Sequence, residues 1–181
     1  MNRLAALSFA AGVCLTATAQ DASTLKVKAG DPFPNVPLVA AQVEKLPGKK
    51  AGDTVGITDL KGKNVVIFFY PKALTKGCTI ESCGFRDLVK DFPADTVLLG
   101  ASADTEKLQD DFIAKEKLPY PLLCDTDLKL IQALGIQSPK GKTPQRKTFV
   151  VGKDGKIAKI YEAVDVNKHP AEVLAFVKGL K

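Results

Sequence analysis

A continuous run of β-branched and aromatic residues, from Asn64 to Tyr70, constrains the fold of this chain more than any other segment. The run reads NVVIFFY and shows no polar alternation, which is typical of a strand buried on both faces of a sheet. Pro71 ends the strand, because proline has no N–H to donate to a neighbouring strand. A sheet covered on both faces needs helices on each side, so the run predicts an α/β domain.

The order of the other elements agrees with a mixed central sheet flanked by helices. Asp154-Gly155 marks a hairpin turn between the last two expected strands. We expect strands or extended pieces at 36–43 (as an edge strand), 96–101, 120–124, 148–151 and 157–161, a short strand and turn at 55–60, and helices at 78–92, 104–115, 126–134 and 170–180.

Length and composition restrict the class of protein. A chain of 181 residues, 45% hydrophobic and 25% charged, suits one globular domain with a sizeable core. The net charge of +6 raises the question of a nucleic-acid partner. The lysines are spread along the chain rather than gathered in one arm, so we expect no nucleic-acid binding.

Residues 1–19 have the organisation of a secretory signal peptide. A positive charge precedes an apolar stretch at 4–15, and 17–19 read Ala-Thr-Ala, a small-residue cleavage signal. The apolar stretch is too short to span a bilayer, which takes about twenty residues. We therefore expect an exported protein without a membrane span, periplasmic in a bacterium, with a short segment at 20–29 before a single domain at 30–181.

Cleavage of that peptide removes Cys14 and leaves three cysteines, Cys78, Cys83 and Cys124. An odd number does not make a disulfide framework. One close pair and one isolated cysteine fit a redox-active pair better. In an oxidising compartment such a pair needs a dedicated reductant to cycle.

Cys78 is placed for reactivity. It follows the buried strand at the carboxyl edge of the sheet, where ligands gather in α/β folds, and it falls in the first turn of a helix. The unpaired N–H groups and the dipole there stabilise a thiolate in what we expect to be an exposed loop. Thr75 can place a hydroxyl near the sulfur. The single histidine, His169, is far along the chain, so we expect electrostatic activation rather than a histidine base.

Cys83 lies five residues after Cys78. In an ideal helix this spacing separates the two Cα atoms by about 8 to 9 Å and turns them to different sides. A disulfide needs Cα atoms within about 7 Å. If both cysteines are helical when reduced, the pair bonds only after local unwinding.

Residues 64–86 resemble the active-site segment of peroxiredoxins of the bacterioferritin-comigratory-protein or Prx-Q subgroup. Pro71-x-x-x-Thr75-x-x-Cys78 matches the motif of that family, and Cys83 stands where the subgroup carries a second cysteine. The similarity extends from about residue 30 to the C-terminus. It implies a thioredoxin-like fold and a thiol-dependent peroxidase that reduces hydrogen peroxide and organic hydroperoxides, without a metal or other cofactor.

The resemblance also implies roles for single residues. Cys78 becomes a sulfenic acid, and Cys83 resolves it to a disulfide that an external thioredoxin-like or other dithiol protein reduces. Arg146 lies over the Cys78 sulfur, Thr75 helps to hold the peroxide, and Pro71 shields the pocket from water. Members of the subgroup are commonly monomers, which we expect here.

Two positions depart from the family pattern. Lys76 stands where relatives often have proline, and Cys124 stands where they commonly have serine. We interpret Cys124 as a small, partly buried residue, with a second resolving thiol as the alternative.

Other functions remain open at this point. A thioredoxin-fold disulfide oxidoreductase carries Cys-x-x-Cys, and an exported copper chaperone carries Cys-x-x-x-Cys with a distant histidine. The Cys-x₄-Cys spacing here fits neither. A redox sensor using the same thiol chemistry is a further alternative, and a zinc site lacks paired ligand spacing.

Overall fold

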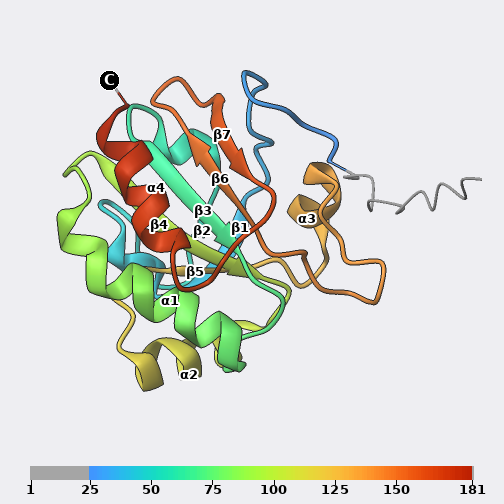
Figure 1. Cartoon of the computed structure of the whole chain (residues 1–181). Coiled ribbons are helices and arrows are strands. Elements are labelled where there is room, and N and C mark those ends of the chain that lie inside the picture. Colours follow the sequence, from blue (N-terminus) through green and yellow to red (C-terminus); the bar gives the residue numbers. More distant parts are fainter. Residues whose placement is uncertain (1–24, 181) are drawn as a thin grey trace, which may run out of the picture.

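The computed structural model describes residues 25–180, so the predicted signal peptide lies outside the described residues. Within that part of the chain one mixed sheet runs in the order β2-β1-β5-β4-β3-β6-β7, with helices on both faces (Figure 1). The strands are β1 (Leu38–Ala41), β2 (Thr54–Val55), β3 (Asn64–Phe69), β4 (Thr96–Ser102), β5 (Leu122–Cys124), β6 (Lys147–Val151) and β7 (Ile157–Tyr161). The helices are α1 (Lys76–Leu88), α2 (Glu106–Glu116), α3 (Lys129–Leu134) and α4 (His169–Lys178), with short 3₁₀ helices at Val43–Lys45, Ile57–Leu60 and Val89–Asp91.

Strand β3 lies inside the sheet, as its unbroken apolar run predicts. It pairs in parallel with β4 and antiparallel with β6, and all its residues are buried. Its side chains alternate between the two faces. Val65, Ile67 and Phe69 join the core on one face, while Val66 and Phe68 join the core on the other.

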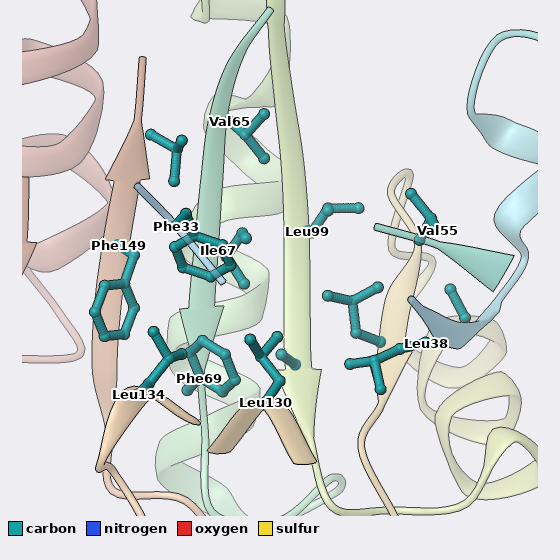
Figure 2. Packing of buried hydrophobic residues seen from close by; sticks show 14 of the residues in the cluster. Phe33, Leu38, Val55, Val65, Ile67, Phe69, Leu99, Leu130, Leu134 and Phe149 are labelled. Atoms are coloured by element: carbon teal, nitrogen blue, oxygen red, sulfur yellow. The ribbon is translucent and has the colours of Figure 1, made fainter. Parts of the chain in front are cut away.

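The two cores differ in what covers them. Figure 2 shows the first, where side chains of β3, β4 and β6 meet Leu130 and Leu134 of α3. On the other face, Phe85 of α1, Phe112 of α2 and Val173 of α4 pack on the sheet. Helices α1, α2 and α4 therefore share one face, and they position the loop that follows β3.

Three sequence predictions need correction. The segment at 36–43 is not an edge strand, because β1 pairs with β2 on one side and β5 on the other. Helix α1 starts earlier than expected and gives way to the 3₁₀ helix at Val89–Asp91. Helix α3 is shorter than 126–134, because Leu128 has a left-handed backbone (φ 62°) and the Asp125 carboxylate accepts the Ile131 N–H across the turn before it.

Phe85 packs α1 against the sheet, so replacing it should destabilise the folded protein. Its ring is fully buried and stacks on Phe68 with centroids 4.6 Å apart. We expect Phe85→Ala to lower the free energy of unfolding by about 3–5 kcal/mol, because a large side chain leaves a cavity. Urea denaturation measures this. Ile80→Ala, at an exposed site on the same helix, is the control and should change stability by less than about 0.5 kcal/mol. Equal losses in the two variants would contradict this packing.

Among residues 25–180, no helix combines the length and the apolar character that crossing a bilayer requires.

Candidate active site

Cys78 lies where the sheet, a loop and a helix start meet. Strand β3 ends at Phe69, and α1 begins at Lys76, so Cys78 falls in the first helical turn as predicted. Main-chain N–H groups in that turn have no intrahelical acceptor and carry the positive end of the dipole. The loop before it is exposed as expected, whereas the Cys78 side chain itself is only 1% exposed.

Arg146 accounts for part of this burial. It directly precedes β6, whose first residue Lys147 pairs with Phe69 at the end of β3. This pairing therefore places Arg146 at the same edge of the sheet as the start of α1. Its Nη2 donates to the Cys78 Sγ at 3.2 Å, which agrees with the predicted position over the sulfur. A fixed positive charge at this distance favours the thiolate.

Glu81 shares the same guanidinium. It lies three residues after Cys78, hence on the same face of α1, and its Oε2 accepts a hydrogen bond from Arg146 Nη1. The Glu81 side chain is fully buried. Burial raises the pKa of Glu81 to about 7, although the charge of Arg146 acts in the opposite direction. Arg146 thus bridges a thiol and a carboxyl group that both lie buried in the protein.

His169 belongs to this cluster despite its distance in sequence. Helix α4 begins with it and packs on α1, which brings its Nε2 to 4.0 Å from Glu81 Oε1. The same nitrogen lies 2.7 Å from Thr148 Oγ1 on β6. Burial and the nearby Arg146 charge lower the pKa of His169 to about 4, so the ring is neutral at pH 7. Sequence separation was a poor reason for leaving His169 out of the site.

The loop between β3 and α1 carries the other two predicted residues. Thr75 is the residue before α1, and its hydroxyl donates to the Lys72 carbonyl oxygen at 2.9 Å. Its placement near the sulfur therefore stays a prediction. Pro71 is half-buried directly after Tyr70, and its shielding role also stays a prediction.

Cys83 lies in the same helix as Cys78, and both thiols are free. The Cys83 Sγ is half-buried and lies 3.5 Å from Glu116 Oε2 at the end of α2. Burial is the main cause that raises the pKa of the Cys83 thiol. The helical conformation of both residues agrees with the predicted need for unwinding before a disulfide forms.

Cys124 is set apart from that pair. It lies in β5, paired with Val39 of β1 and Ser102 of β4. Its side chain is buried more fully than expected, and burial raises the pKa of the thiol to about 11. Such a thiol is almost entirely protonated at neutral pH, which favours a packing role over that of a second resolving thiol.

Within the described residues 25–180, no three His, Cys, Asp or Glu side chains are grouped so that they could hold a metal ion.

Comparison with known proteins identifies the family. The sequence profile of the AhpC/TSA family matches residues 29–160. The chain belongs to the AhpC/TSA family. It is 39% identical to peroxiredoxin Bcp of Bacillus subtilis over 136 residues, which cover 71% of this chain and 87% of that one. It is 35% identical to peroxiredoxin Bcp of Escherichia coli K12 over 134 residues, covering 70% and 86%.

Solved structures of AhpC/TSA proteins show the same architecture. A PrxQ variant from Xylella fastidiosa superposes with a TM-score of 0.74 at 28% identity, covering 83% of this chain and 95% of the other. The bacterioferritin comigratory protein of Xanthomonas campestris gives a TM-score of 0.72 at 29% identity, covering 83% and 98%. The predicted thioredoxin-like fold and the predicted peroxiredoxin family are thereby confirmed.

Sequence reasoning missed two residues of this AhpC/TSA site. Glu81 had a usable signal, because a carboxyl three residues after the nucleophile shares its helix face. His169 had none, because only the packing of α4 on α1 brings it to the cluster.

Proposed function

We propose that this peroxiredoxin reduces hydroperoxides with Cys78 as the attacking thiolate and Cys83 as the resolving thiol. The observation that supports this proposal most directly is the 3.2 Å contact between Arg146 Nη2 and the buried Cys78 Sγ at the start of α1. A thiolate is the nucleophilic form of cysteine, and this contact favours it without a histidine base. The neutral His169 contacts Thr148 instead.

The first step is a two-electron oxidation of sulfur. The Cys78 thiolate attacks one peroxide oxygen, so that an S–O bond forms while the O–O bond breaks. The other oxygen leaves and takes up a proton as water or an alcohol, and the sulfur becomes a sulfenic acid. The planar donors of Arg146 can stabilise the negative charge that develops on the leaving oxygen.

We propose that the substrates include organic hydroperoxides. The Xanthomonas campestris relative has an alkyl peroxide reduction activity, which supports this substrate class. Hydrogen peroxide is small enough to use the same site.

The second step needs α1 to open. The Cys83 sulfur attacks the sulfenic acid, an S–S bond forms, and the hydroxyl leaves as water. Because an intact helix holds the Cα atoms about 8 to 9 Å apart, the middle of α1 has to unwind.

Two hydrogen bonds oppose that opening. The Arg86 Nη1 donates to the Glu116 carbonyl oxygen at 2.7 Å, and the Tyr120 hydroxyl donates to the Ser82 carbonyl oxygen at 2.7 Å. Both tie α1 to the end of α2 and the segment after it. They therefore help to set how often Cys83 can reach Cys78.

An external dithiol protein completes the cycle by thiol–disulfide exchange. The half-exposed position of Cys83 supports attack at that sulfur once α1 has opened. We further propose that the protein acts as an exported monomer, so that the reductant shares its compartment; the expected signal peptide at 1–19 supports export.

Replacing Cys83 tests this cycle. In Cys83→Ser we expect one equivalent of peroxide to be reduced at the wild-type rate, whereas turnover with a dithiol reductant falls at least about tenfold. The wild-type chain should form a Cys78–Cys83 disulfide and lose amide protection in α1; the variant should do neither. Mass spectrometry and hydrogen exchange after one equivalent of peroxide measure both. Cys124→Ser is the matched control and should behave like wild type. A disulfide that forms with α1 fully protected would contradict the opening step.

A further inference from the structure

His169 occupies a closed space between α1, α4 and the sheet. Its side chain is fully buried, with its ring centroid 5.7 Å from that of Phe85 and 4.9 Å from that of Tyr161. A polar ring in such a place costs free energy unless its nitrogens are used. The question is therefore what the imidazole does there.

The hydrogen-bond partners of His169 indicate which of its ring nitrogens carries the proton. Since burial keeps His169 neutral at pH 7, only one of its two nitrogens carries a proton. Within the described chain, Nδ1 has no hydrogen-bond partner, whereas Nε2 faces two oxygens, Thr148 Oγ1 and Glu81 Oε1. A proton on Nε2 is the arrangement that these partners favour, because both oxygens can accept it.

Glu81 needs such a donor. Its Oε2 is satisfied by Arg146, but its Oε1 is buried without a hydrogen-bond partner among residues 25–180. The 4.0 Å to His169 Nε2 is longer than a hydrogen bond, and a shift of about 1 Å closes it. Hydrogen bonding to a carboxylate favours its ionised form.

We propose that His169 is a positioning residue whose Nε2–H keeps Glu81 ionised and aligned, so that Glu81 holds the Arg146 guanidinium on the Cys78 sulfur. This inference rests on the proposed role of Cys78. It makes a chain of contacts from the first residue of α4 through α1 to the reactive thiol.

The charged and titratable groups around the imidazole support this assignment. Glu81 faces it from α1, Arg146 from the segment before β6, and Tyr161 from β7. Arg146 keeps its charge throughout the working pH range. The Tyr161 hydroxyl donates to the Glu172 carbonyl oxygen at 3.2 Å and is thereby engaged elsewhere. Glu81 remains as the group whose ionisation near neutral pH the imidazole can control.

The pH dependence of peroxide reduction tests the proposal. The rate of Cys78 oxidation should be measured by quench-flow and mass spectrometry from pH 5.5 to 9 in His169→Leu, which removes the donor. The rate should rise with pH as Glu81 ionises, and in His169→Leu we expect the midpoint of that rise to move up by about one pH unit. The rate of this variant should then be about fivefold below wild type at pH 7 and within twofold of wild type at pH 9. His169→Gln, whose amide N–H replaces Nε2–H, should stay within about twofold at every pH. A loss of equal size at all pH values, or an unmoved midpoint, would overturn the proposal.

Two further variants separate this effect from damage to the fold. Val173→Ala removes a buried contact of the same helix and should leave the midpoint unchanged. Glu81→Gln cannot ionise, so adding His169→Leu to it should change nothing more; a second, additive shift would contradict the proposal. If His169→Leu does not fold, Thr148→Val gives a second test: it removes the competing acceptor of the Nε2 proton, so the midpoint should move down, and an upward or unmoved midpoint would contradict the proposal.

Failure of this inference is distinguishable from failure of the proposed function. If Cys78→Ser still reduces peroxide, the proposed function fails. If Cys78→Ser is inactive while His169→Leu keeps the wild-type pH profile, only the role of His169 fails.

Discussion

Arg146→Met is expected to slow the reaction of Cys78 with hydrogen peroxide about 10³-fold. The guanidinium contacts the sulfur at 3.2 Å, so its loss removes a charge that favours the thiolate. It also removes donors placed where charge develops on the peroxide, an effect worth about 10²–10³ for a single donor elsewhere. The chain contains no tryptophan, so the rate should be followed by quench-flow with mass spectrometry rather than by intrinsic fluorescence.

Two controls define the role of Arg146 more closely. Arg146→Lys keeps the charge but loses the planar fork that bridges Cys78 and Glu81, and its rate should lie between those of Met and Arg. Lys142→Met removes an exposed charge four residues away and should change the rate less than about twofold. Rates within threefold of wild type for both Arg146 variants would contradict the proposed activation of the thiol.

Local patterns predicted much of the fold. The apolar run at 64–70 identified the buried strand β3, and Asp154-Gly155 identified the β6–β7 hairpin. Such patterns depend only on residues close together in the sequence, so they can be recognised without knowing the tertiary structure. The neighbours of β1 depend on long-range pairing, and its prediction as an edge strand was therefore wrong.

The residues of the candidate site likewise divide into those that the local sequence predicts and those that only tertiary packing brings together. Cys78 was placed correctly at the helix start because strand, loop and helix are consecutive. The position of Arg146 came from the family resemblance, and the register of β6 against β3 explains it. The contact between Glu81 and His169 joins two helices distant in sequence, so no local pattern carries it. The Thr75 hydroxyl found a partner in its own loop, which residue spacing alone did not indicate.

The central claim is that the Cys78 sulfur is the atom that peroxide oxidises. Serine is nearly the same size as cysteine, so Cys78→Ser keeps the packing of the helix start and removes the nucleophilic thiolate. Arg146 and Glu81 keep their contact with each other in this variant, which leaves the pocket assembled. The loss of activity then reports on the sulfur alone.

The most direct test is the rapid oxidation of the fully reduced protein by one equivalent of hydrogen peroxide, followed by quench-flow and mass spectrometry in wild type and three serine variants. We predict that Cys78→Ser loses the reaction by at least about 10⁴-fold, while Cys83→Ser and Cys124→Ser are oxidised at the wild-type rate. Oxidation of Cys78→Ser as fast as wild type would contradict the account.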